Sequence, residues 1–132
     1  MLNHQIYELQ IELPCKVRGK PSVRVSRSSR APNRGYFDPK YKQYCGLVGM
    51  LLRKQYPHQT IDTNFEIEVE FLFKNLKNGK PDLDNCLKSL LDILQDARII
   101  SDDRFCTAIQ AKKIHGSEKH GMNIWLKTTS NI

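Results

Sequence analysis

Apolar and acidic side chains alternate along the stretch FEIEVEFLF, which spans residues 65–73. Successive side chains of a strand point to opposite faces of its sheet, so the odd-numbered apolar residues of this stretch would form a buried face. The other face carries Glu66, Glu68 and Glu70. Three carboxylates on one face could bind a metal. A solvated sheet face is the favoured interpretation.

Two helices are predicted, one before and one after this strand. Residues 83–96 place apolar side chains at helical spacing, at Leu83, Leu87, Leu90, Leu91 and Leu94. The other helix is predicted over residues 39–56. Asp38 can cap that helix and Pro39 suits its first position, and Pro57 ends it.

Three further segments are predicted to be strands, because residues 6–13, 104–114 and 121–128 alternate apolar and polar side chains. Residues 115–120 would form the hairpin loop between the last two. A length of 132 residues suits one domain. The element order predicts a single small α/β (α+β) domain over residues 1–132, with a mixed four-stranded sheet and two helices.

The composition is that of a globular protein, with 39% hydrophobic and 27% charged residues. No apolar run reaches the length of a membrane helix, and the first 20 residues alternate like a strand instead of forming a signal peptide. We therefore expect a cytoplasmic protein with no membrane partner. The cysteines are scattered, without a C-x-x-C pair, at Cys15, Cys45, Cys86 and Cys106. Free thiols, the last three of them buried, are favoured over a zinc site.

Basic residues exceed acidic residues by seven, since 21 lysines and arginines face 14 aspartates and glutamates. A basic balance in a small domain points to a polyanion, most often nucleic acid. The excess is concentrated in residues 14–37, a stretch without a single acidic residue. Prolines, glycines and serines interrupt any regular period in this stretch. It is interpreted as a basic loop that contacts phosphates, in preference to a solvated surface loop.

The most informative stretch is KPDLDNCLK, residues 80–88. Asp82 and Asp84 stand two residues apart where the second helix is predicted to begin. Lys88 follows Asp84 by four residues, so that the two side chains share one helical face.

A second acidic pair, Asp102-Asp103, follows the same helix. A helix and the strand after it can fold back, so that this turn approaches the start of the helix or its flank. Carboxylates gathered in this way repel one another, and a hard divalent cation such as Mg²⁺ relieves that repulsion. A nuclease needs such a set of groups to hold Mg²⁺, to activate water and to neutralise charge at phosphorus.

A purely structural interpretation stays open at this point. Asp82 can be only a helix cap, and acidic side chains at a helix start are also favoured by the helix dipole. Asp102-Asp103 can be only a turn.

The order and spacing of these motifs resemble the RusA family of Holliday junction resolvases. The resemblance rests on Asp82-Leu83-Asp84-Asn85, Lys88, Leu91-Asp92 and Asp102-Asp103 before a strand. The length, the element order and the basic N-terminal loop agree with it. It implies a small homodimeric, Mg²⁺-dependent endonuclease of DNA recombination and repair, often carried by prophages. Such enzymes cut branched DNA, four-way junctions, by paired nicks.

The resemblance also implies roles for particular residues. Asp82, Asp84 and Asp103 would hold Mg²⁺, and a metal-activated water would attack the phosphodiester. Lys88 would be the catalytic lysine, and Asn85 and Asp102 would lie next to the residues that bind the metal. Three roles stay open for Asp102: it could ligate the metal through water, cap the turn or fix Lys88. DNA phosphates would be bound by Lys16, Arg18, Lys20, Arg24, Arg27, Arg30 and Arg34, with Tyr36 or Phe37 stacking on an opened base.

Two rival hypotheses remain. One is a non-catalytic protein of phage origin that binds branched DNA. The other is a different Mg²⁺ phosphotransfer enzyme with a D-x-D motif, which is disfavoured because the chain has no Gly-rich phosphate loop. For the homodimer contact, the helix around Tyr44 and Leu47 is favoured over the sheet edge near Trp125.

Overall fold

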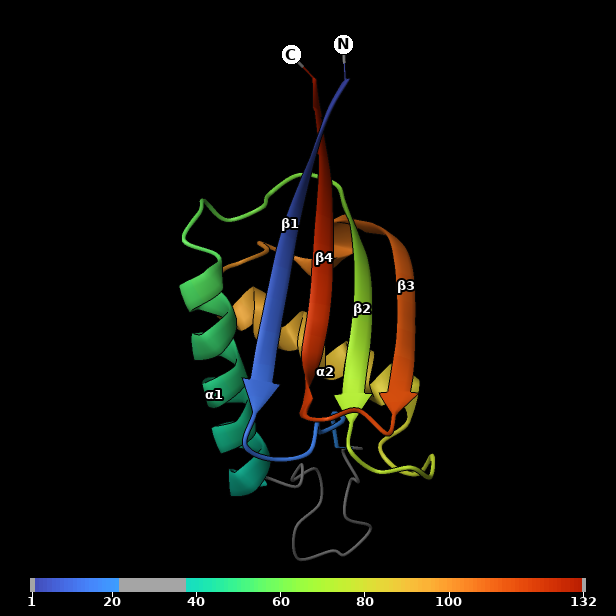
Figure 1. Ribbon diagram of the computed structural model, residues 1–132. Helices are drawn as coiled ribbons and strands as arrows, with labels where there is room; N and C mark the ends of the chain where they lie inside the picture. The colour runs from blue at the N-terminus through green and yellow to red at the C-terminus, as the bar shows by residue number, and fades with distance from the viewer. Residues whose placement is uncertain (1, 22–37, 132) are drawn as a thin grey trace, which may run out of the picture.

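The structure of the protein is a computed structural model that describes residues 2–21 and 38–131. Within these residues the chain forms four strands, two α-helices and one 3₁₀ helix. The strands are β1 (Leu2–Leu13), β2 (Phe65–Phe73), β3 (Cys106–His115) and β4 (His120–Asn131). The helices are α1 (Pro39–Gln55), α2 (Leu83–Asp96) and the 3₁₀ helix η1 (Asp103–Phe105). The predicted small α+β domain with a mixed four-stranded sheet and two helices is confirmed (Figure 1).

The strands are ordered β1-β4-β2-β3 in the sheet. β4 runs antiparallel to both β1 and β2, and β3 runs parallel to β2. A parallel neighbour requires a crossover connection, which α2 supplies between β2 and β3. The candidate site belongs to this β2-α2-β3 unit, because its residues lie at the start of α2, which follows the end of β2.

The predicted hairpin over residues 115–120 is wrong. β2 lies between β3 and β4, so the connecting loop crosses the end of β2 instead of joining two neighbours. The Gly116 N–H donates to the Asn75 carbonyl and the Ser117 N–H to the Phe73 carbonyl, each at 3.0 Å. Gly116 has a φ of 74°, a conformation that glycine adopts without a Cβ penalty. Alternation along two strands cannot show that a third strand separates them.

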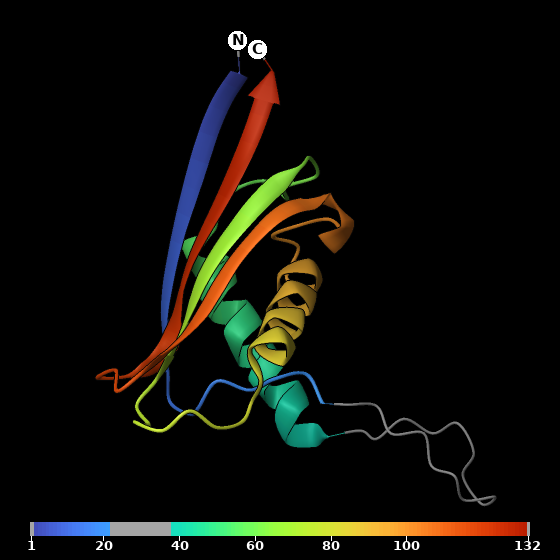
Figure 2. The ribbon, with the colours of Figure 1, turned by 90° about the vertical axis from the view of Figure 1, so that its right-hand side faces the viewer.

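One face of the sheet packs against α1 and α2, as Figure 2 shows from the side. The core joins the odd-numbered residues of β2 to the apolar stripes of the helices. Its fully buried members include Val69, Phe71, Leu90, Leu94, Val48 and Leu52. Tyr41 and Ser89 link the helices directly, since the Tyr41 hydroxyl donates to Ser89 Oγ at 2.9 Å.

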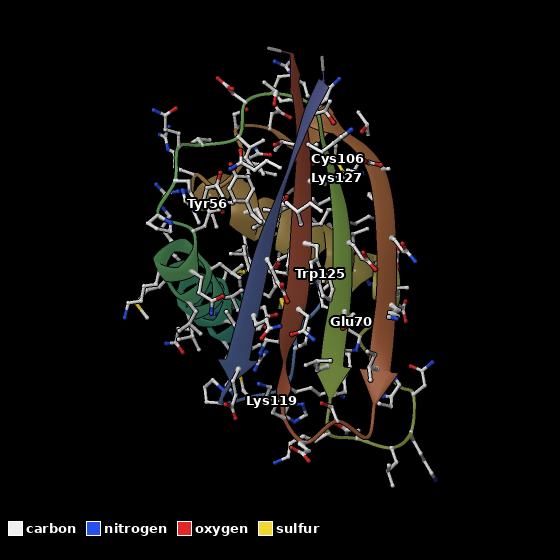
Figure 3. The ribbon with its side chains drawn as sticks, turned by 45° about the horizontal axis from the view of Figure 1, so that its top comes forward. Tyr56, Glu70, Cys106, Lys119, Trp125 and Lys127 are labelled. Atoms are coloured by element: carbon white, nitrogen blue, oxygen red, sulfur yellow. The ribbon has the colours of Figure 1, made fainter. Side chains whose placement is uncertain are left out.

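The opposite face of the sheet is open to solvent (Figure 3). Glu66 and Glu68 are exposed there and Glu70 is half-buried, as the alternation predicts. Basic residues on the neighbouring strands balance part of this charge: Lys127 Nζ lies 3.9 Å from Glu66 Oε2, and Lys112 Nζ lies 3.2 Å from Glu70 Oε2. The hydrogen bond from Asn123 and the interaction with Lys112 lower the pKa of Glu70. This face is therefore a polar sheet surface.

Three smaller expectations need correction. All four cysteines are free thiols, but only Cys86 is buried, whereas Cys45 and Cys106 are half-buried. Tyr44 is 4% exposed, so it packs into the core and offers little surface to a second subunit. Trp125 belongs to β4, which is flanked by β1 and β2, and so it does not lie at a sheet edge.

No helix in the described ranges is both long enough and apolar enough to cross a membrane.

A leucine-to-alanine substitution should lower the free energy of unfolding much more in the core than at the surface. Leu94 is fully buried, whereas Leu76 is 86% exposed. We expect Leu94→Ala to lower the free energy of unfolding by about 2–5 kcal/mol, because it removes buried methyl groups and leaves a cavity. Leu76→Ala should change that free energy by less than ~0.5 kcal/mol. Chemical denaturation of both variants measures the difference, and equal losses would contradict this description of the core.

Candidate active site

The start of α2 presents two exposed carboxylates, from Asp82 and Asp84. Asp82 stands at the N-cap position, where its carbonyl accepts the Cys86 N–H at 3.0 Å. Within the described residues its side chain makes no capping hydrogen bond. The capping interpretation therefore does not account for the Asp82 carboxylate, which remains available to a ligand.

Lys88 lies one helical turn beyond Asp84 on the same face of α2. Its Nζ is 3.8 Å from Asp84 Oδ2, and the two side chains are 64% and 70% exposed. An ion pair this exposed and this long is weak, so both groups can exchange it for interactions with a substrate. The structure thus brings Asp84 and Lys88 together, and it places the exposed Asp82 at the N-cap position two residues before Asp84.

The second acidic pair has two different environments. Asp102 caps η1, because its Oδ1 accepts the Arg104 N–H at 2.9 Å while its Oδ2 lies 3.7 Å from Arg104 Nε. Of the roles left open for Asp102, the structure favours capping the turn. Asp103 is exposed, and its backbone N–H donates to Gln95 Oε1 at 3.1 Å.

The two acidic pairs lie near opposite ends of α2. This helix has 14 residues and so spans about 21 Å at 1.5 Å per residue. Asp103 contacts its last turn through Gln95, and Figure 2 shows η1 beside the end of α2 that is remote from Asp82. In residues 2–21 and 38–131, no three His, Cys, Asp or Glu side chains are grouped closely enough to hold a metal ion. The turn approaches the far flank of the helix and not its start.

The basic loop over residues 14–37, called the basic segment from here on, contacts the first turn of α2 through its described part. The Lys20 N–H donates to the Asn85 carbonyl at 3.0 Å. A Cβ added to Gly19 would lie 2.8 Å from Pro81 Cβ and 2.9 Å from Asn85 Cβ, so only glycine allows this approach. The entry to the basic segment is therefore held beside Asp82 and Asp84.

Lys20 forms an ion pair within the protein. Its Nζ lies 2.8 Å from Asp92 Oδ2, and the hydrogen bond and charge of Asp92 raise the pKa of Lys20. The predicted phosphate contact of Lys20 thus competes with an ion pair that holds the segment along α2. Arg24, Arg27, Arg30 and Arg34, with Tyr36 and Phe37, lie outside the described residues.

A cleft of about 650 Å³ adjoins Asp82, between the loop before α2 and β3. Three lysines that were not predicted as site residues line it: Lys80, Lys112 and Lys113. The alternation of β3 indicates that Lys112 and Lys113 point to opposite faces of the sheet. The sequence gives no sign that β3 lies next to Asp82, because that proximity follows from the parallel pairing with β2.

The contact at Gly19 predicts opposite effects for two glycine substitutions. Gly19→Ala should lower the melting temperature, because the new methyl group would collide with Pro81 and Asn85. Gly46→Ala is the control: a Cβ there meets nothing within 4 Å, and alanine in a helix interior is about 1 kcal/mol more favourable than glycine. Thermal unfolding of both variants tests this, and a Gly19→Ala protein as stable as the wild type would show that the contact is not tight.

Comparisons with known proteins point to one family. A family described as Endodeoxyribonuclease RusA matches residues 14–127, a range that contains the basic segment, both acidic pairs and Lys88. A crossover junction endodeoxyribonuclease RusA from Aquifex aeolicus (strain VF5) is 29% identical over 76 residues. These residues cover 58% of this chain and 59% of the length of that relative.

Proposed function

We propose that this chain, which belongs to the RusA family of endodeoxyribonucleases, is a metal-dependent enzyme that resolves four-way DNA junctions by paired nicks. The observation that carries the proposal is the exposed group of Asp82, Asp84 and Lys88 at the start of α2, in contact with the entry to the basic segment. The proposed cleavage site and the basic segment that would bind phosphates therefore meet at the first turn of α2. The Aquifex relative, named a crossover junction endodeoxyribonuclease, supports the choice of substrate.

The donor set fits a hard divalent cation. Asp82 and Asp84 offer exposed carboxylate oxygens, which Mg²⁺ prefers, and neither is consumed by a helix cap or a short ion pair. Asp103 would provide the third carboxylate. When bound, such a cation would activate water and neutralise charge at the scissile phosphate.

A homodimer would resolve the separation of the two acidic pairs. Because α2 holds Asp103 away from Asp82 and Asp84 in one subunit, we propose that the partner subunit's Asp103 completes each site. Two nicks on opposite strands require two equivalent active sites, and a two-fold dimer is the commonest way to provide them. Each site would then combine the start of α2 from one subunit with η1 from the other.

The remaining residues would bind and orient the substrate. Lys88, released from its weak pair with Asp84, would stabilise the negative charge that develops on the phosphate. Lys16, Arg18 and the arginines of residues 24–34 would contact backbone phosphates. Lys20 would keep the basic segment in place through Asp92.

The activity is tested with a synthetic four-way junction and a linear duplex of matched sequence. We expect paired nicks in the junction with Mg²⁺, no cleavage in EDTA, and little cleavage of the duplex. Asp84→Asn should bind the junction at least as tightly as the wild type and cut it at least ~100-fold more slowly, because it lacks a charge that holds the metal. Gel analysis of cleavage and a binding assay in EDTA give both quantities. Tight junction binding by the wild type without cleavage would favour the non-catalytic alternative.

Mixing two inactive variants tests whether each site is shared between subunits. Asp84→Asn and Asp103→Asn should each be inactive, yet dimers formed by refolding them together should nick junctions once. In such a dimer one site carries both substitutions and the other carries neither. A mixture of Asp82→Asn with Asp84→Asn is the control, since both of its sites stay defective. No recovery in the first mixture would mean that Asp103 acts in its own subunit, and activity of Asp103→Asn alone would remove Asp103 from the site.

A further inference from the structure

Lys113 makes three hydrogen bonds to the loop that precedes α2. Its Nζ donates to Asn78 Oδ1 at 2.8 Å, to the Gly79 carbonyl at 2.7 Å and to the Pro81 carbonyl at 2.7 Å. An ammonium group has three N–H donors, so these three acceptors account for all of them. The ammonium also lies 5.2 Å from the centre of the Phe73 ring, a favourable cation–π distance.

These contacts act on the segment that carries Asp82. The Pro81 carbonyl belongs to the peptide unit whose nitrogen is that of Asp82, so a bond to this oxygen orients the backbone from which the Asp82 side chain projects. The same loop has little packing of its own, since residues 74–80 are exposed. The three bonds from Lys113 on β3, together with the contact between Gly19 and Pro81, therefore hold the backbone that carries the first carboxylate of the site.

The charge of Lys113 also reaches the start of α2. Its three acceptors are neutral oxygens, so these bonds leave its positive charge in place. One of these oxygens is the Pro81 carbonyl, directly before Asp82, so the charge of Lys113 lies close to the start of α2.

We propose that Lys113 is a positioning residue for Asp82: it fixes the loop over residues 78–81, so that the Asp82 carboxylate is held in place beside Asp84. The proposal rests on the proposed function, because it assigns Lys113 to the same metal site. Removing a residue that orients a metal ligand typically costs about 10–100-fold in metal affinity. Lys113 itself need not touch the metal or the DNA.

The test compares Lys113→Met with Lys112→Met. Lys112 is the neighbouring residue on β3 and pairs with Glu70 on the open face. Binding of Mn²⁺ to the dimer, followed by electron paramagnetic resonance without DNA, should weaken by about 10–100-fold in Lys113→Met and stay near the wild-type value in Lys112→Met. Junction binding in EDTA should be unchanged in Lys113→Met, because the DNA contacts lie elsewhere. The Mg²⁺ concentration for half-maximal cleavage should rise in parallel with the loss of Mn²⁺ affinity.

A milder variant covers the case in which Lys113→Met fails to fold. Asn78→Ala removes only the exposed side-chain acceptor and leaves the bonds to Gly79 and Pro81, so it should weaken Mn²⁺ binding in the same direction by a smaller factor. Wild-type Mn²⁺ affinity in every folded variant among Lys113→Met and Asn78→Ala would overturn the role of Lys113. A wild-type protein that binds Mn²⁺ but cuts no junction would count against the proposed function alone.

Discussion

The parallel pairing of β2 with β3 is the constraint on which the site depends. It forces the chain to cross the sheet between these strands, and α2 makes that crossing with its apolar stripe on the core. The start of α2 is thereby held at the carboxyl end of β2, next to β3. This placement brings Lys113 to the loop before Asp82, and the length of α2 puts Asp103 at the other end of the helix.

The two faces of the fold carry different patterns of charge. The open face of the sheet carries glutamates that are partly balanced by Lys112 and Lys127, so the described part of this face mixes charges of both signs. The helix face carries the exposed Asp82, Asp84 and Lys88, and the basic segment enters beside them. We infer that DNA approaches the helix side at the start of α2. Lys20 and Lys113 instead position parts of the protein. Lys20 holds the basic segment to Asp92, and Lys113 holds the loop before α2.

Local patterns predicted the elements well because each element obeys its own periodicity. The strand over residues 65–73 and the helix over residues 83–96 have the predicted limits, since alternation and the leucine stripe respond directly to burial. The hairpin prediction failed because strand order depends on contacts across the sheet, which a local pattern does not encode. β1 and β4 also extend beyond the predicted ranges, where they pair mainly with each other.

The candidate site was predictable only in part. The spacing of Asp84 and Lys88 places them on one face of the helix, with Asp82 at its start, whatever the rest of the fold does. The position of Asp103 depends on where the chain emerges after α2, and the length of that helix keeps it apart from the other two within a subunit. The role of Lys113 could not be predicted from the sequence either. Its three acceptors are neutral oxygens of a loop, and no residue pattern marks such a contact.

We propose that each metal site joins Asp82 and Asp84 of one subunit to the partner subunit's Asp103. The most direct measurement is the position of Mn²⁺ in crystals of the wild-type dimer, located by its anomalous scattering. We expect a peak within coordinating distance of Asp82 and Asp84, with the partner subunit's Asp103 as a further ligand. A peak bound only by Asp102 and Asp103 of one subunit, with none beside Asp82, would contradict it.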